Sequence, residues 1–306
     1  MSRKFRFTGE CLDRLKEYYA RLSGGKPDAP ASPEGAQAEA AEEAAPSVPD
    51  RAEQAQAEAE IVDPLQTTGG KTTSITRTDI GRVRASNQDA LIDAWPLLGV
   101  ADGMGGHQGG EVASASARDL LIQLLKGKEP DPQALRTAIT AVNKRLFIRQ
   151  GEEKELAGMG TTLTVLWAGK EDMLIGHVGD SRAYRLRDGE WRQMTADHSM
   201  VAEMVREGLL TQEQAACHPM RNVITRAVGT EEGVNADILT EKRCRGDVWL
   251  VCSDGLHGMV DDEKLADLLR RNDPEKAADL MLQAALEAGG RDNISLAILV
   301  DGEDPA

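Results

Sequence analysis

Residues 161–186, TTLTVLWAGKEDMLIGHVGDSRAYRL, contain three short β-rich runs that follow one another directly. Glycines separate the runs, and the turn dipeptide Asp188-Gly189 follows the last of them. Gly and Asp-Gly turns of this kind join antiparallel strands in hairpins. This part of the chain therefore predicts neighbouring antiparallel strands. The three expected strands are 161–167, 173–178 and 183–186.

The same pattern extends in both directions, from Thr72 to the C-terminal end. Strand patterns mostly follow strand patterns directly, and the helical patterns fall into two groups. This order favours a layered antiparallel α/β sandwich over an alternating βαβ fold. Further strands are expected at 73–78, 97–101, 248–252 and 294–300. Helices are expected at 111–125, 132–150, 200–207, 263–270 and 274–287.

The first 70 residues differ from the rest in composition. Residues 1–26 repeat apolar side chains at helical spacing, which predicts a short amphipathic helix. This helix either docks on a partner or an anionic membrane surface, or lies on the main domain. Residues 27–70 are mostly Ala, Glu, Gln and Pro, and almost no large apolar side chain offsets the entropy of ordering, so we expect a disordered linker. The compact domain is expected at 71–302.

The charge balance argues against nucleic acid as a partner. The 306 residues include 36 Lys and Arg against 51 Asp and Glu, for a net charge of −15, which repels a polyanion. This charge is uneven, because residues 28–63 carry ten acidic groups and one basic group.

The cysteines and apolar runs indicate a reducing, cytoplasmic location. The four cysteines show no CxxC spacing, and the longest uncharged apolar run, Val248–Cys252, is far too short to cross a bilayer. The charged N-terminus lacks the apolar core of a signal peptide. We therefore expect no transmembrane segment and no export.

Four aspartates occur at the edges of expected buried strands: Asp102 after LLGVA, Asp180 after LIGHVG, Asp254 after VWLVCS and Asp292 before NISLAILV. A single Asp there is usually a turn former or a helix cap. Four on separate strands can instead converge on one cleft. Carboxylates without Cys or paired His ligands suit hard cations such as Mg²⁺ or Mn²⁺.

Two glycines and two arginines support this metal-site hypothesis. Gly103 and Gly255 each follow one of the aspartates, and Gly permits a sharp turn that can expose a carbonyl oxygen to a metal. Arg82 and Arg84 precede Asp89 in GRVRASNQDA, and the guanidinium of either offers a phosphate two parallel donors. An Arg in a turn is usually a surface charge, but beside a metal cluster it favours phosphate binding.

These residues belong to motifs that recur in a known family. In their order along the chain they resemble the bacterial PPM/PP2C metal-dependent Ser/Thr protein phosphatases, from about Thr72 to Val300. The motifs are Gly81-x-x-Arg84-x-x-Asn87-Gln88-Asp89, VADGMGGH (100–107), GEVAS (110–114), GMGTTL (158–163), VGDSRAY (178–184), DHS (197–199), NVITRAVG (222–229), CSDGL (252–256) and DNIS (292–295).

The resemblance implies an α+β fold, a four-layer α/β/β/α sandwich of two antiparallel sheets flanked by helices. It also implies two Mn²⁺ or Mg²⁺ ions in a cleft, with a third, weaker ion possible. By the resemblance, Asp102 bridges the two metals, Gly103 gives one of them a carbonyl oxygen, and Asp254 and Asp292 hold the other. Asp89 acts through metal-bound water, and Asp180 is the ligand of the third metal.

The resemblance further implies hydrolysis of phosphoserine and phosphothreonine by a metal-activated water, without a phosphoenzyme. Arg84 would bind the substrate phosphate. Some relatives have a His where this chain has Met104, so the leaving-group acid is either His107 or a metal-bound water. His257 stands where relatives often have Thr or another small polar residue; it either tunes the cleft or serves local packing, and we expect local packing. A flap that influences substrate choice is expected at 198–229, including His198, Arg221, Asn222 and Thr225.

The expected function is dephosphorylation of proteins that a cognate Ser/Thr kinase phosphorylates. Two alternatives stay open at this point. One is a non-catalytic phosphoprotein-binding module, which the complete set of aspartates disfavours. The other is a phosphatase dedicated to one small phosphoprotein of a partner switch or a secretion apparatus.

Overall fold

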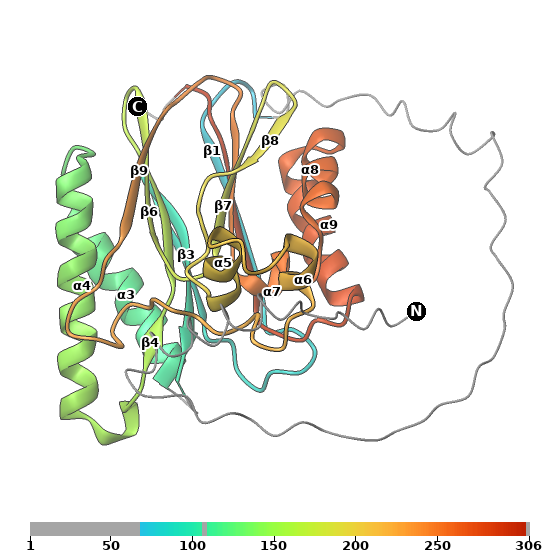
Figure 1. Ribbon diagram of the computed structural model, residues 1–306. Coiled ribbons are helices and arrows are strands. Elements are labelled where there is room, and N and C mark those ends of the chain that lie inside the picture. The colour runs from blue at the N-terminus through green and yellow to red at the C-terminus, as the bar shows by residue number, and fades with distance from the viewer. Residues whose placement is uncertain (1–67, 106–108, 304–306) are drawn as a thin grey trace, which may run out of the picture. The chain divides into compact units, whose positions relative to one another are not determined.

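The computed structural model describes residues 68–105 and 109–303 (Figure 1). The helix expected at 1–26, nearly all of the linker expected at 27–70, and His107 lie outside the described residues. The chain divides into two units. Within the described part, residues 203–218 belong to one unit and the remaining residues to the other, which holds both sheets.

Two antiparallel sheets form the larger unit. The first has the strand order β1-β11-β10-β7-β8, and the second has the order β2-β3-β5-β6-β9, with β4 paired to β3. The first sheet contains β1 (Thr73–Asp79), β7 (Arg182–Arg187), β8 (Glu190–Gln193), β10 (Val248–Cys252) and β11 (Ile294–Val300). The second contains β2 (Asp89–Ala94), β3 (Leu97–Met104), β4 (Gly160–Thr161), β5 (Leu163–Ala168), β6 (Asp172–Val178) and β9 (Asp237–Lys242).

A pair of helices covers the outer face of each sheet (Figure 1). Helices α3 (Gly109–Leu125) and α4 (Pro132–Glu152) pack on the second sheet, and α8 (Asp262–Arg271) and α9 (Pro274–Glu287) pack on the first. This arrangement confirms the predicted four-layer α/β/β/α sandwich.

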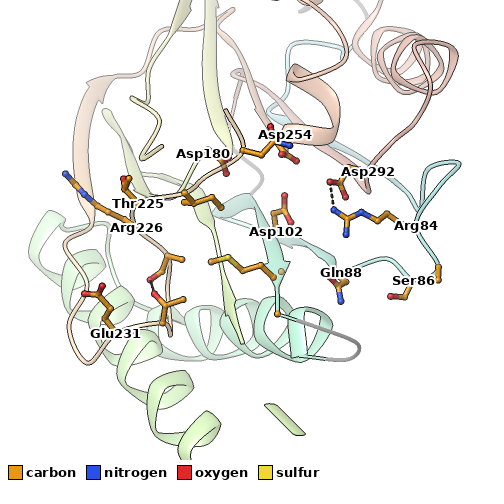
Figure 2. Close-up of a pocket in the computed structure, with 18 residues that line it drawn as sticks. Arg84, Ser86, Gln88, Asp102, Asp180, Thr225, Arg226, Glu231, Asp254 and Asp292 are labelled. Carbon is orange, nitrogen blue, oxygen red and sulfur yellow. Dashed lines mark hydrogen bonds and ion pairs between the residues drawn. The ribbon is translucent and has the colours of Figure 1, made fainter. Parts of the chain in front are cut away.

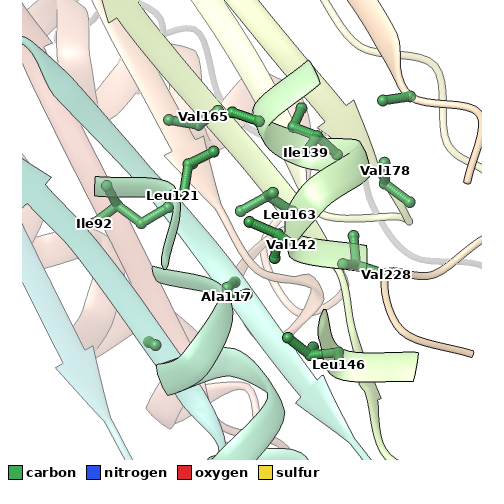
Figure 3. Packing of buried hydrophobic residues seen from close by; sticks show 14 of the residues in the cluster. Ile92, Ala117, Leu121, Ile139, Val142, Leu146, Leu163, Val165, Val178 and Val228 are labelled. Atoms are coloured by element: carbon green, nitrogen blue, oxygen red, sulfur yellow. The ribbon is translucent and has the colours of Figure 1, made fainter. Parts of the chain in front are cut away.

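The strand sequences account for the layers because both faces of the central strands are buried. In β10, Val248 and Leu250 face the α8–α9 side, while Trp249 and Val251 face the other sheet. Successive side chains of a strand point to opposite faces, so an unbroken apolar run fills two cores. On the outer face of the second sheet, Leu121, Ile139 and Leu163 pack into the core shared with α3 and α4 (Figure 3).

Aspartates fix the starts of three of the helices. The side chains of Asp131, Asp261 and Asp273 each accept a hydrogen bond from the backbone N–H three residues later, at 2.6, 2.9 and 2.9 Å. Such N-caps satisfy donors that a helix start leaves without a partner. Pro132 and Pro274 occupy the first helical position, where a missing N–H costs nothing.

Three strands and several short helices were missed by the sequence analysis. Strands β2, β8 and β9 are all edge strands, so only one side is paired and their side chains are more polar than those of central strands. The short elements are a 3₁₀ turn (Lys154–Leu156), α6 (Gln212–Ala216) and α7 (Asp254–His257). The expected helix at 200–207 is α5 (Met200–Arg206).

Candidate active site

Four aspartates from separate elements line one cleft of about 650 Å³ (Figure 2). Asp102 comes from β3 and Asp180 from the turn after β6. Asp254 is the first residue of α7, and Asp292 lies just before β11. The structure thus brings together the four aspartates that the sequence singled out.

Asp89 lies against this cluster because of the strand register. It begins β2 and is paired directly with Asp102 of β3. Its Oδ2 accepts a hydrogen bond from Ser253 Oγ at 2.9 Å, and Ser253 immediately precedes Asp254. Strand pairing therefore places Asp89 opposite Asp102, and the hydroxyl of Ser253 connects Asp89 to the residue that precedes Asp254.

The crowding of carboxylates raises their pKa values. Loss of solvation and the neighbouring Asp89 raise the pKa of Asp102 well above its ordinary value. Loss of solvation, followed by repulsion from Asp254, raises the pKa of Asp180 to about 7. Loss of solvation and Asp292 raise that of Asp254 to about 6. A cluster of this kind becomes fully ionised at neutral pH only when positive charge is supplied.

The donor set fits a hard divalent cation. Asp89 Oδ1 and Asp254 Oδ1 are shielded from solvent and have no hydrogen-bond partner among the described residues. Buried carboxylate oxygens without a partner are costly, and oxygen donors are what Mg²⁺ and Mn²⁺ prefer. As the side chains stand, no group of three or more His, Cys, Asp or Glu residues in 68–105 and 109–303 is arranged to hold a metal ion. The fit therefore rests on donor chemistry and charge, not on a preformed coordination shell.

Arg84 lines the same cleft and contacts one of the aspartates. Its Nη2 donates to Asp292 Oδ2 at 2.6 Å, and its side chain is half exposed. Asn293 holds the loop that carries Arg84: Nδ2 donates to Ile80 O at 3.0 Å and to Ser86 O at 2.9 Å. The guanidinium is therefore presented to the cleft by a loop that is fixed on both sides of it.

The expected role of Gly103 and Gly255 in sharp turns is wrong. Gly103 lies within β3 and Gly255 within α7, and neither has a positive φ. A Cβ on Gly103 would come within 2.0 Å of Gly110 O, and one on Gly255 within 2.0 Å of Asn293 O. The two positions exclude side chains because backbone segments pass very close to them.

The residues expected in the flap separate into two groups. Asn222 and Thr225 line the cleft, together with Arg226 and Glu231 (Figure 2). His198 is buried, and its Nδ1 accepts a hydrogen bond from Gly179 N–H at 3.1 Å. Neither His198 nor Arg221 is among the described residues that line the cleft.

Two further residues position the cleft: Thr162, which lies in the motif GMGTTL (158–163), and Asn143, which lies in none of the motifs. Thr162 Oγ1 accepts a hydrogen bond from Asp102 N–H at 2.9 Å. Asn143, fully buried in α4, accepts one from Gly229 N–H at 2.7 Å and donates to Glu231 O at 3.0 Å. An isolated Asn inside a helical pattern does not indicate that its side chain binds the backbone of a distant loop, so the sequence did not predict the role of Asn143.

Residues 81–287 match the model of the family described as protein phosphatase 2C. The chain belongs to this family. It is 39% identical over 236 residues to the serine/threonine phosphatase stp of Listeria welshimeri serovar 6b, which covers 73% of this chain and 93% of that protein. The resemblance drawn from the motifs is thereby confirmed.

Solved structures agree with this assignment. The crystal structure of the Mycobacterium tuberculosis serine/threonine phosphatase PstP/Ppp has a TM-score of 0.72 and 36% identity, covering 76% of this chain and 99% of that one. The catalytic domain of PstP in complex with two manganese ions gives a TM-score of 0.69 at 36% identity, covering 75% and 99%. PppA, described as a key regulatory component of T6SS in Pseudomonas aeruginosa, gives 0.68 at 34% identity, covering 75% and 97%.

The chain is therefore a serine/threonine protein phosphatase that acts on phosphorylated proteins and is metal-dependent as its family is. The predictions of fold, family and activity are confirmed. Within the described ranges, no helix combines the length and the apolar character that crossing a bilayer requires.

Proposed function

We propose that this phosphatase hydrolyses phosphoserine and phosphothreonine with two Mn²⁺ or Mg²⁺ ions held in the cleft that Asp102 lines. The observation that carries the proposal is the convergence of four carboxylates beside Arg84, with two shielded oxygens that have no partner among the described residues. Asp102, Gly103, Asp254 and Asp292 are the proposed ligands of this pair, and Asp89 acts through bound water. Asp180 is the proposed ligand of a third ion.

Each residue has a distinct part in the reaction. Arg84 binds two phosphate oxygens in parallel and orients the phosphorus atom, while Asp292 holds the guanidinium in place. Asp102 and Asp254 provide the negative charge that retains the cations. When bound, a cation pair supplies an acidified water for in-line attack and neutralises charge on the phosphoryl oxygens.

The leaving serine or threonine oxygen needs a proton. Met104 lines the cleft, and its thioether has no proton to donate. The proposed donors are therefore a water molecule or His107.

We propose phosphorylated proteins of the cytoplasm as substrates, produced by a cognate Ser/Thr kinase. The low cysteine content without CxxC spacing and the acidic net charge of −15 support a reducing compartment and partners other than nucleic acid. A phosphatase dedicated to one phosphoprotein of a secretion apparatus is the alternative. PppA supports it, because PppA is a key regulatory component of T6SS in Pseudomonas aeruginosa. We propose that residues 1–70, the expected helix and linker, select the partner, whether the phosphatase acts on many phosphoproteins or on one.

The test is hydrolysis of p-nitrophenyl phosphate and of a phosphothreonine peptide with Mn²⁺. We expect EDTA to abolish activity, added Mn²⁺ to restore it, and Asp102→Ala to reduce kcat by about a hundred- to a thousandfold, as the loss of a principal electrostatic group does. Activity that survives in EDTA or in Asp102→Ala would contradict the two-metal mechanism.

A further inference from the structure

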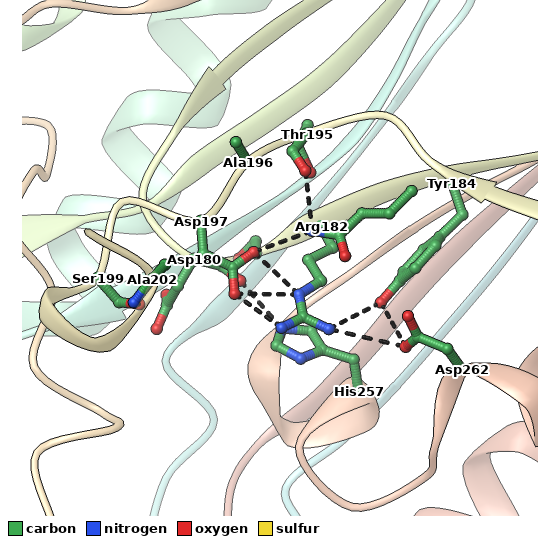
Figure 4. Close-up of polar contacts among 12 residues, drawn as sticks. Asp180, Arg182, Tyr184, Thr195, Ala196, Asp197, Ser199, Ala202, His257 and Asp262 are labelled. Atoms are coloured by element: carbon green, nitrogen blue, oxygen red, sulfur yellow. Dashed lines mark hydrogen bonds and ion pairs between the residues drawn. The ribbon is translucent and has the colours of Figure 1, made fainter. Parts of the chain in front are cut away.

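His257 links two of the aspartate-bearing elements (Figure 4). It is the last residue of α7, the short helix that begins at Asp254. Its Nε2 lies 2.9 Å from the backbone carbonyl oxygen of Asp180, which is 77 residues away in the sequence. One hydrogen bond therefore connects the helix that carries Asp254 with the turn that carries Asp180.

The chemistry of this contact is fixed by its acceptor. A carbonyl oxygen can only accept a hydrogen bond, so His257 Nε2 must carry the hydrogen and donate it. That nitrogen is consequently not a metal-binding atom. Of the two roles considered for His257, local packing and tuning of the cleft, this bond to the backbone of a cleft residue favours the second.

The turn that carries Asp180 is held at each of three successive residues. Gly179 N–H donates to His198 Nδ1 at 3.1 Å, Asp180 O accepts from His257, and Ser181 Oγ lies 2.9 Å from Thr162 Oγ1. Of these anchors, the one from His257 comes from α7. It is thus the anchor that links Asp180 directly to the element carrying Asp254.

An ion pair stabilises the next residues along the chain. Arg182 donates to both carboxylate oxygens of Asp197, with its Nε 2.9 Å from Oδ1 and its Nη2 2.7 Å from Oδ2. Its Nη1 also donates to Tyr184 Oη at 3.2 Å, and Tyr184 donates to Asp262 at 3.0 Å (Figure 4). This network holds the strand after the turn, whereas the hydrogen bond from His257 reaches Asp180 itself.

A tether is needed here because the two carboxylates repel each other. Asp180 and Asp254 both line the cleft and carry like charges when both are ionised, so their repulsion favours movement of Asp180 away from Asp254. Residues behind a metal ligand typically change metal affinity about 10- to 100-fold when they are removed.

We infer that His257 is a positioning residue that keeps Asp180 facing the cleft beside Asp254, and so raises the affinity of the cleft for divalent cations. This inference rests on the proposed function, because it takes the cleft to be the cation site. It concerns His257, a side chain outside the proposed ligand set.

The test is Mn²⁺ binding to the full chain, measured by calorimetry. His257→Met removes the donor and replaces the ring with an apolar side chain of similar size. His257→Gln keeps an N–H donor at a similar distance from the backbone. We expect His257→Met to weaken binding of the Asp180-dependent Mn²⁺ ion about 10-fold, and His257→Gln to bind it within about threefold of wild type. His257→Thr, which shortens the side chain and so moves its donor away from Asp180 O, serves as a second variant if the Met variant does not fold.

A double-mutant cycle separates positioning from a general structural effect. If His257 acts through Asp180, His257→Met causes no further loss of affinity in an Asp180→Asn background. Tyr184→Phe is the matched control, because it removes one hydroxyl from the same network without touching Asp180. It should lower the melting temperature and leave Mn²⁺ affinity unchanged.

Three results would overturn the inference. They are equal Mn²⁺ affinity in wild type, His257→Met and His257→Thr; a loss that persists in the Asp180→Asn background; and a loss of the same size in Tyr184→Phe. A wild-type chain that binds no Mn²⁺ would instead overturn the proposed function and this inference with it. The two failures are therefore distinguishable.

Discussion

Arg84 offers the sharpest test of phosphate binding at the level of a single residue. One of its N–H groups bonds to Asp292 at 2.6 Å, and its half-exposed guanidinium borders the cleft. A lysine provides a point charge but not two parallel donors. We expect Arg84→Lys to lower kcat/KM for a phosphothreonine peptide by about 10- to 100-fold, the range for a charged hydrogen bond of about 1.5–3 kcal/mol.

Arg82 provides the control for this substitution. It lies in the same loop, and its backbone N–H donates to Gly290 O at 2.7 Å, but it is not among the described residues that line the cleft. Arg82→Lys should therefore leave kcat/KM unchanged. An equal loss in both variants would show that the substitutions disturb the loop as a whole, and that the loss is not specific to the guanidinium of Arg84.

Helix α4 contributes to the cleft through Asn143. Its side chain bonds to Gly229 N–H, Glu231 O and Glu232 O at 2.7, 3.0 and 3.2 Å. Asn143→Ala leaves these backbone groups without this partner, so we expect the free energy of unfolding in urea to fall by about 1–3 kcal/mol. Because Thr230 and Glu231 line the cleft, KM for a phosphopeptide should rise more than KM for p-nitrophenyl phosphate.

The exposed neighbour Lys144 makes a suitable control for Asn143. Lys144→Ala should change neither the stability nor either KM by a measurable amount. If Asn143→Ala lowers stability but raises both KM values equally, the contact stabilises the fold without shaping the region that distinguishes protein substrates.

The elements that sequence reasoning found and missed differ in how they are buried. Central strands such as β10 and β11 are buried along their whole length, and their continuous apolar runs predicted them. Edge strand β2 reads DALIDA, with an Asp at position 89 that faces Asp102 across the sheet. Its partner, β3, is the next strand along the chain. Strand β2 forms because it pairs with β3, and its own amino-acid composition does not indicate that pairing.

The same limit applies to the candidate site. The aspartates could be found because each interrupts or ends an apolar run and belongs to a motif. The contacts of Asn143 and His257 depend on segments about 80 residues away, Gly229 and Asp180, and no local pattern encodes such a distance. Sequence thus located the candidate ligands, whereas the structure was needed to find the residues that position them.

At the level of the whole molecule, the net charge of −15 arises from two groups of acids in different parts of the chain. Residues 28–63 hold ten acidic groups and one basic group, outside the described residues. Several acids of the described domain instead crowd one cleft, where loss of solvation and mutual repulsion raise their pKa values. This second group of acids is the one that the proposed mechanism uses.

Truncation tests whether catalysis needs the N-terminal region. Among the described residues, those that line the cleft run from Arg84 to Asp292. Near the start of the described part, Glu303 N–H donates to Gly70 O and Thr72 N–H donates to Glu303 O, both at 2.8 Å. We expect a chain that begins at residue 68 to retain kcat/KM for p-nitrophenyl phosphate within about twofold. A chain that begins at residue 74 loses these two bonds and should be less stable to urea by about 1–3 kcal/mol, at about 0.5–1.5 kcal/mol for each bond. A large loss of activity in the chain that begins at residue 68 would show that residues 1–67 belong to the catalytic unit. Phosphopeptide kinetics of the full chain and of the chain that begins at residue 68 would show whether residues 1–67 select the substrate.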